Sequence, residues 1–129
     1  MILIEKSNEN LEIALCAENK EYYDVAVSRL YYSIYQKILY YLDKTQMKID
    51  ENKKKDKGSH DAIIQLMTQH VNLFHKEGIE SISYLRGLKL SRKKADYDGE
   101  KIKKIKYKEI KENYEEINNF LDILLNKNI

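Results

Sequence analysis

The chain contains no proline and only four glycines among its 129 residues. Hairpin-rich β proteins need such turn residues at regular spacing, so their scarcity argues against an all-β fold and excludes collagen-like or Pro/Gly-rich disordered chains. The single cysteine, Cys16, can form neither an intramolecular disulfide nor a thiolate zinc site. No apolar run approaches the roughly 18 residues of a membrane span, and the N-terminus does not resemble a signal peptide. We therefore expect a cytoplasmic protein without a membrane segment.

What the chain does contain is 43% hydrophobic and 34% charged residues, in patterns typical of helices. Apolar residues recur at steps of three and four, and no segment alternates as a strand does. The five predicted helices cover about residues 8–20, 22–44, 59–75, 79–95 and 107–127. Ser7 and Ser59 are the predicted N-caps of the first and third helices.

Two of the predicted helices indicate how the others pack. Segment 22–44 is apolar around most of its circumference, which is typical of a helix that is central or shared with another subunit. Segment 107–127 repeats apolar residues at the a and d positions of a heptad. We predict one all-α domain over residues 1–129, a five-helix, mainly antiparallel up-and-down bundle. A lysine-rich loop at about 45–58 and a basic loop at about 98–106 connect its helices.

Arg92 is the charged residue that fits its position least, since it shares its predicted helix face with apolar residues. A guanidinium on such a face must be paired, open to a cleft or contact a partner. One interpretation is a structural ion pair, for instance with Asp96 or Asp98. The other is a functional polar cleft, which the neighbouring Lys93 and Lys94 favour.

Three short motifs follow one another along the chain: SRLYY at 28–32, SH at 59–60 and RKKADY at 92–97. In these motifs, over roughly residues 15–125, the chain resembles the HEPN domain family. The resemblance implies an all-α bundle that forms a homodimer with its polar motifs facing each other. Many such relatives are metal-independent RNases of toxin–antitoxin, phage-defence or CRISPR systems. Others are non-catalytic RNA- or partner-binding domains, often encoded beside a minimal nucleotidyltransferase.

The resemblance also implies roles for the last motif. Arg92 would contact an RNA phosphate, Asp96 would orient the arginine and Tyr97 would supply a hydroxyl group. Catalytic relatives carry a histidine a few residues after the arginine, whereas here no histidine follows Arg92 and Tyr97 stands near that place. A tyrosine with its ordinary pKa of about 10 is a poor base at neutral pH. Whether the chain cleaves RNA or only binds it is open at this point.

Other candidate site residues surround these motifs. Residues 101–111 contain six lysines and one glutamate, which predicts either a solvated loop or a rim that contacts phosphate. The predicted RNA-binding lysines are Lys93, Lys94, Lys103 and Lys104. Most tyrosines are expected to pack at bundle edges, with stacking on single-stranded bases as the alternative. The possible cleft or dimer residues are Ser28, Tyr32, Tyr35 and His60.

The remaining candidates favour structural roles. His70 and His75 are five residues apart and do not share a helix face, so we expect no metal site, and no cofactor is implied. Cys16 is interpreted as a small core residue.

Three functions remain: an RNA-binding or ribonuclease-related component of a toxin–antitoxin or phage-defence module, a non-catalytic module that partners a nucleotidyltransferase, or a structural subunit without a ligand. In some relatives the nucleotidyltransferase adenylylates a tyrosine near the motif, here Tyr97.

Overall fold

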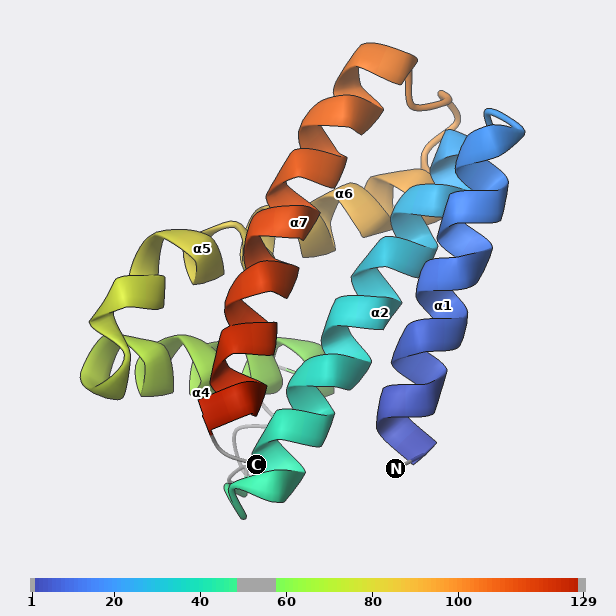
Figure 1. The fold of residues 1–129 in the computed structure, drawn as a ribbon. Coiled ribbons are helices and arrows are strands. Elements are labelled where there is room, and N and C mark those ends of the chain that lie inside the picture. Colours follow the sequence, from blue (N-terminus) through green and yellow to red (C-terminus); the bar gives the residue numbers. More distant parts are fainter. Residues whose placement is uncertain (1, 49–57, 128–129) are drawn as a thin grey trace.

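A computed structural model describes residues 2–48 and 58–127, and in these residues every regular element is helical, with no strand (Figure 1). The prediction of an all-α fold is confirmed. The helices are α1 (Ile2–Asn19), α2 (Tyr23–Lys44), α4 (Ser59–Phe74), the 3₁₀ turn η1 (Lys76–Gly78), α5 (Ile79–Ser83), α6 (Leu85–Tyr97) and α7 (Lys104–Lys127).

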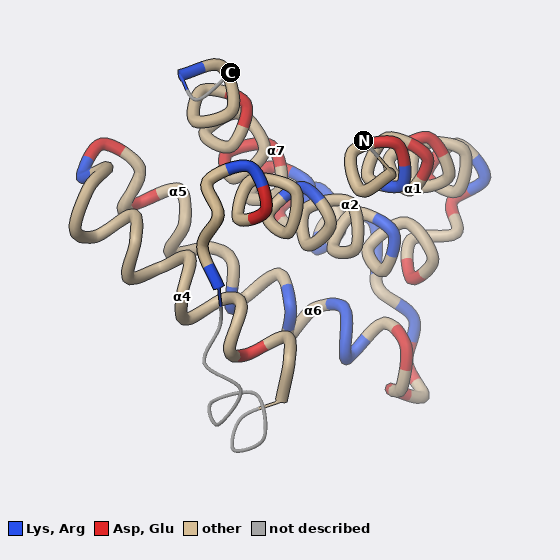
Figure 2. Tube along the Cα trace, turned by 90° about the horizontal axis from the view of Figure 1, so that it is seen from below, with Lys and Arg blue, Asp and Glu red and all other residues tan. Residues whose placement is uncertain are grey.

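The helices form two layers, with α1, α2 and α7 side by side and α4 to α6 crossing behind them (Figures 1 and 2). The expected antiparallel packing holds for α1 and α2, but α2 and α7 run in the same direction. Tyr23 stacks on Tyr107 at the start of both helices, and Lys37 contacts Asp122 further along both. The two helices are parallel because α4 to α6 bring the chain back to the end of the bundle where α2 begins. There the backbone N–H of Ile102 donates to Asp24.

The core is built around α2, as its wide apolar surface predicts, because α2 packs against α1, α6 and α7. Its residues Leu30, Tyr31, Ile34 and Ile38 have no exposed surface. The a/d seam predicted for α7 is also confirmed. Its buried residues are Tyr107, Ile110, Tyr114, Ile117, Phe120, Leu121, Leu124 and Leu125.

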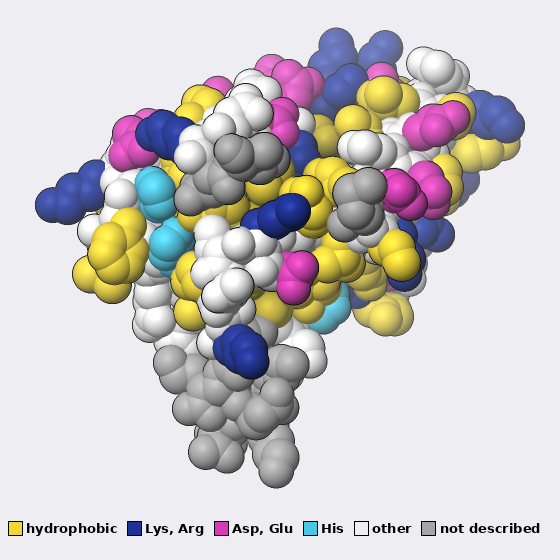
Figure 3. Space-filling view, turned by 60° about the horizontal axis from the view of Figure 1, so that its bottom comes forward, with side chains coloured by type: hydrophobic (Ala, Val, Ile, Leu, Met, Phe, Trp, Pro, Cys, Tyr) yellow, Lys and Arg dark blue, Asp and Glu magenta, His cyan; other side chains and the backbone are white. Residues whose placement is uncertain are grey.

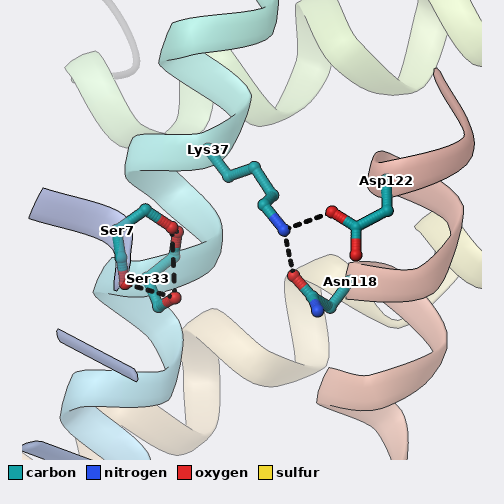
Figure 4. A network of polar contacts seen from close by, with 5 residues as sticks. All are labelled: Ser7, Ser33, Lys37, Asn118 and Asp122. Carbon is teal, nitrogen blue, oxygen red and sulfur yellow. Dashed lines mark hydrogen bonds and ion pairs between the residues drawn. The ribbon is translucent and has the colours of Figure 1, made fainter. Parts of the chain in front are cut away.

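Two serines hold α1 against α2 by reciprocal hydrogen bonds (Figure 4). Ser7 Oγ donates to the Ser33 carbonyl at 2.6 Å, and Ser33 Oγ donates to the Ser7 carbonyl at 2.9 Å. The prediction of Ser7 as an N-cap is therefore wrong: α1 begins at Ile2, and Ser7 lies buried inside it. The prediction for Ser59 is also wrong, because Ser59 is the first residue of α4. The N-cap position is occupied by Gly58, which has a φ of 85°.

The segment predicted as one helix over 79–95 is divided at Tyr84 into α5 and α6. Ser83 Oγ donates to the Glu80 carbonyl at 2.5 Å, and the Tyr84 N–H bonds instead to the Ser81 carbonyl, three residues back. A serine that bonds a backbone carbonyl in this way competes with the helical pattern. The apolar face continues across the break, since Ile82, Leu85 and Leu88 are all buried.

The loops differ from their predicted bounds. Because α7 begins at Lys104, the basic loop is limited to residues 98–103, and the remaining lysines of the stretch lie on a helix. Of the lysine-rich loop predicted at about 45–58, residues 49–57 lie outside the described residues.

Candidate functional site around Arg92

Arg92 lies on the buried face of α6, with only 9% of its side chain exposed. The guanidinium faces two tyrosine rings of α2, with its Cζ 5.3 Å from the centre of Tyr31 and 5.6 Å from that of Tyr32. Its Nη1 is 3.4 Å from Asp96 Oδ2, one turn further along α6. Its Nε is buried and has no hydrogen-bond partner within residues 2–48 and 58–127. The ion pair expected with Asp96 is present, but it is long and leaves the guanidinium only partly satisfied.

His60 reaches the same place from the first turn of α4. Its ring stacks on Tyr35, with ring centres 4.1 Å apart and planes 5° from parallel, and its Nδ1 is 2.7 Å from the Tyr31 hydroxyl. Tyr31 itself is fully buried, whereas Tyr32, Tyr35 and His60 are half-buried. We call the group formed by Tyr31, Tyr32, Tyr35, His60, Arg92 and Asp96 the Arg92 cluster.

Burial favours the neutral forms of Tyr31, Tyr35 and His60 in the cluster. Burial raises the pKa of Tyr31 and of Tyr35 above the ordinary value. Burial also lowers the pKa of His60, and the positive charge of Arg92 lowers it further. Asp61, the next residue on α4, pairs with Lys89 of α6, and this ion pair lowers the pKa of the Asp61 carboxyl. Arg92 is therefore the buried charge of the cluster, beside neutral rings.

The remaining predicted residues lie at different distances from this centre. Lys93 and Lys94 are exposed on α6, where several basic residues gather (blue in Figure 2). Tyr97 is 80% exposed at the end of α6. Ser28 is half-buried on α2, and its side chain forms no hydrogen bond with another described residue. The structure thus brings Tyr32, Tyr35 and His60 to Arg92, while Tyr97 points into solvent.

The other two predicted RNA-binding lysines, Lys103 and Lys104, lie after the end of α6. Lys103 is exposed in the loop before α7. Lys104 lines a pocket of about 360 Å³ together with the acidic Glu18 and Glu21. A second pocket, of about 290 Å³, lies between α6 and α7 and includes Lys94. Of the four predicted RNA-binding lysines, Lys93 and Lys94 directly follow Arg92 on α6, and the other two lie beyond the end of that helix.

A second tyrosine–histidine pair joins α2 to α4. The Tyr41 hydroxyl is 2.8 Å from His70 Nε2, and the ring of His70 lies 5.1 Å from that of His75. Histidine side chains are visible at two separate places in Figure 3. Equal spacing in the sequence is the signal of both pairs: Tyr31 and Tyr41 are ten residues apart on α2, as are His60 and His70 on α4.

Acidification from pH 7.5 to 5 is expected to lower the melting temperature by roughly 4 °C. Burial lowers the pKa values of His60 and His70 from the ordinary 6.5, and the charge of His75 lowers that of His70 further. Between pH 6.5 and these lowered pKa values, the unfolded chain binds more protons than the folded protein does. The stabilisation from the two neutral histidines is therefore fully present above pH 6.5 and is lost as the pH falls through this window. Thermal melts at several pH values measure it.

The matched control is the double variant His60→Gln, His70→Gln. Glutamine does not titrate, so its melting temperature should change little over the same range. Ion pairs lower the pKa values of the Glu18 and Asp61 carboxyls. Their contribution to stability is lost only below pH 4.5 for Glu18 and below pH 3.8 for Asp61, which is outside the tested range. A wild-type protein that melts at the same or a higher temperature at pH 5 would contradict the prediction.

Cys16 is exposed, so its interpretation as a core residue is wrong: it lies on the outer side of α1, while Ala14 and Ala17 face α2. Within residues 2–48 and 58–127, no group of three or more His, Cys, Asp and Glu side chains could hold a metal ion. None of the described helices is long and apolar enough to cross a membrane.

Comparison with known proteins gives one match. A protein of Methanocaldococcus jannaschii named "Putative toxin MJ0142" is 32% identical to this chain over 97 residues. The match covers 74% of this chain and 60% of that protein, so the chain spans less than two thirds of its relative. No family model matches the chain. No solved structure matches it.

Proposed function

We propose that this protein is the RNA-binding component of a toxin–antitoxin module, and that the Arg92 cluster contacts the phosphate backbone of the RNA. The similarity to a protein named as a toxin supports the first part, and the chemistry of the cluster supports the second. The proposal includes a homodimer, as the HEPN resemblance implies. In such a dimer the two clusters would face each other across the RNA.

The observation that carries the proposal is the incomplete pairing of a buried arginine. A buried guanidinium is costly unless ion pairs and hydrogen bonds satisfy it. Here the counter-ion Asp96 is 3.4 Å away, and Nε has no hydrogen-bond partner in the described part of the chain. Two tyrosine rings hold the group in place. A phosphodiester that reaches the 9% of the Arg92 side chain that is exposed would supply a second counter-ion, with the planar geometry that arginine and phosphate share.

The surroundings of Arg92 suit single-stranded RNA. Lys93 and Lys94 are exposed beside it and would contact neighbouring phosphates. The half-buried rings of Tyr32 and Tyr35 lie in the same cluster, and aromatic rings of this kind stack on unpaired bases. These are sequence-independent contacts, so binding to many RNA sequences is expected.

Arg92→Ala is expected to weaken binding of a single-stranded RNA oligonucleotide about tenfold, because it removes a charge-assisted contact. Fluorescence anisotropy of the purified proteins measures the affinity. Inducible expression in a bacterial host gives the second readout: the wild type should slow growth, and the variant should not. RNA integrity in the same cultures shows whether arrest is accompanied by cleavage.

Arg86→Ala is the matched control, since it removes an exposed arginine from the same helix and changes the net charge equally. Its affinity should stay within about twofold of the wild type, because Arg86 is exposed and is not a member of the Arg92 cluster. Thermal melts verify that both variants fold. If Arg92→Ala and Arg86→Ala bind alike and binding vanishes at modest salt, the lysines alone account for it and the proposal fails.

The exposure of Tyr97 favours a second candidate function. At 80% exposure its hydroxyl is accessible to a modifying enzyme. The chain would then be a non-catalytic module that a minimal nucleotidyltransferase binds and adenylylates. Co-expression with such an enzyme, followed by mass spectrometry, would find an added nucleotide on Tyr97 in this case. An unmodified Tyr97 and the absence of a co-purifying protein would exclude it.

A further inference from the structure

The hydrogen bond between Tyr31 and His60 determines which ring nitrogen of His60 carries a proton. Tyr31 is fully buried, and its hydroxyl contacts no hydrogen-bond partner in residues 2–48 and 58–127 other than His60 Nδ1, at 2.7 Å. If Nδ1 carried the proton, it would donate to the hydroxyl oxygen and leave the buried hydroxyl hydrogen without an acceptor. An unsatisfied buried donor is costly. The hydroxyl of Tyr31 therefore donates to an unprotonated Nδ1.

A neutral imidazole with an unprotonated Nδ1 has its proton on Nε2. Burial keeps the ring neutral at neutral pH, since it lowers the pKa of His60. The stack on Tyr35 fixes the plane of the ring, and the hydrogen bond with Tyr31 fixes which edge of the ring carries Nδ1. His60 thus presents an N–H donor on the side of the ring that faces away from Tyr31, in the same cluster as the guanidinium of Arg92.

We propose that Tyr31 is a positioning residue that holds His60 in its Nε2–H form, so that His60 donates a hydrogen bond to the RNA phosphodiester that Arg92 binds. This inference rests on the proposed function and deepens it. Cleavage of RNA requires a base that accepts the proton of the 2′-hydroxyl. In His60 the lone pair of Nδ1 is occupied by Tyr31, and Nε2 has no free lone pair. His60 therefore binds the phosphodiester and does not act as the base of a cleavage reaction.

Nitrogen NMR of the full-length, ¹⁵N-labelled protein at pH 7.5 tests the first step without any ligand. The wild type should show an unprotonated Nδ1 and a protonated Nε2 for His60. Tyr31→Phe should show both tautomers in exchange. The matched control Tyr35→Phe removes a hydroxyl one turn further along α2 while keeping an aromatic ring against His60, so it should retain the wild-type pattern. A protonated Nδ1 in the wild type, or a pattern that Tyr31→Phe leaves unchanged, would overturn the role of Tyr31.

Binding of a 5′-labelled single-stranded RNA oligonucleotide tests the second step. The amide nitrogen of glutamine lies close to the position of Nε2 and donates, but it cannot act as a base. His60→Gln should therefore bind within about threefold of the wild type, whereas His60→Ala should bind about fivefold more weakly. The oligonucleotide should remain intact in every sample.

The two experiments separate failure of the inference from failure of the proposed function. Cleavage by the wild type that His60→Gln abolishes would make His60 a base and overturn the inference, although RNA would still be the ligand. Equal binding by His60→Ala and the wild type would exclude a hydrogen bond from His60 to RNA. If the wild type binds no RNA, both the proposed function and the phosphodiester ligand are wrong, and the NMR pattern still decides the role of Tyr31.

Discussion

Replacement of Gly78 by alanine is expected to lower the free energy of unfolding by about 3 kcal/mol. Gly78 is buried at the end of the 3₁₀ turn η1, and a Cβ at this position would overlap the ring of Phe120 on α7. Phe120 is only 4% exposed, so its ring cannot swing out of the way without disturbing the core. The backbone conformation is not the cause, because the φ of Gly78 is −103°. Urea denaturation of the purified variant measures the effect.

Two further variants identify the Phe120 ring as the cause. Gly87 lies inside α6 with open space where a Cβ would stand, so Gly87→Ala should stabilise the protein by about 0.5–1 kcal/mol through helix propensity alone. In a Phe120→Leu background, the smaller side chain leaves room, and Gly78→Ala should cost clearly less than it does in the wild type. Equal stability of Gly78→Ala and the wild type would show that η1 and α7 separate easily.

Asp122→Ala is expected to destabilise the protein by about 2 kcal/mol, because it leaves a buried ammonium group without a counter-ion. Lys37 of α2 has only 10% of its side chain exposed, and its Nζ donates to Asp122 Oδ1 at 2.5 Å and to Asn118 Oδ1 at 2.7 Å (Figure 4). Breaking a fully buried pair costs more, but Asp122 is 52% exposed and solvent screens part of the interaction. Chemical denaturation measures the loss.

Lys37→Met tests whether Asp122→Ala destabilises the protein through the unpaired buried charge or through lost packing. Methionine keeps much of the apolar stem and removes the charge, so its stability should be within about 1 kcal/mol of the wild type. In that background Asp122→Ala should cost less than about 0.5 kcal/mol, because no buried ammonium group remains to be paired. The exposed pair of Lys127 with Glu77 is the surface control, and Lys127→Ala should change stability by no more than about 0.5 kcal/mol. A similar loss for Asp122→Ala in both backgrounds would contradict this account.

The fold class and the faces of the helices could be predicted from the sequence because they follow from local periodicity. The seam of α7 is the clearest case, since its a and d positions are all buried: Tyr107, Ile110, Tyr114, Ile117, Leu121 and Leu124. Arg92 could be identified for the same reason: it stands at a position of the repeat where an apolar residue is expected, and it is indeed buried. The start of α1 was misplaced because Ser7 is a common N-cap residue that here serves to join two helices.

The arrangement of the site was decided by the tertiary structure alone. The sequence places no histidine after Arg92, yet His60 joins the Arg92 cluster from α4 because the second layer crosses α2 at the level of Tyr31 and Tyr35. The parallel course of α2 and α7, which buries Lys37 beside Asp122, depends on the same crossing. Periodicity shows which face of a helix is buried but not which helix covers it. That choice is made by the packing of side chains between helices that are distant in the chain.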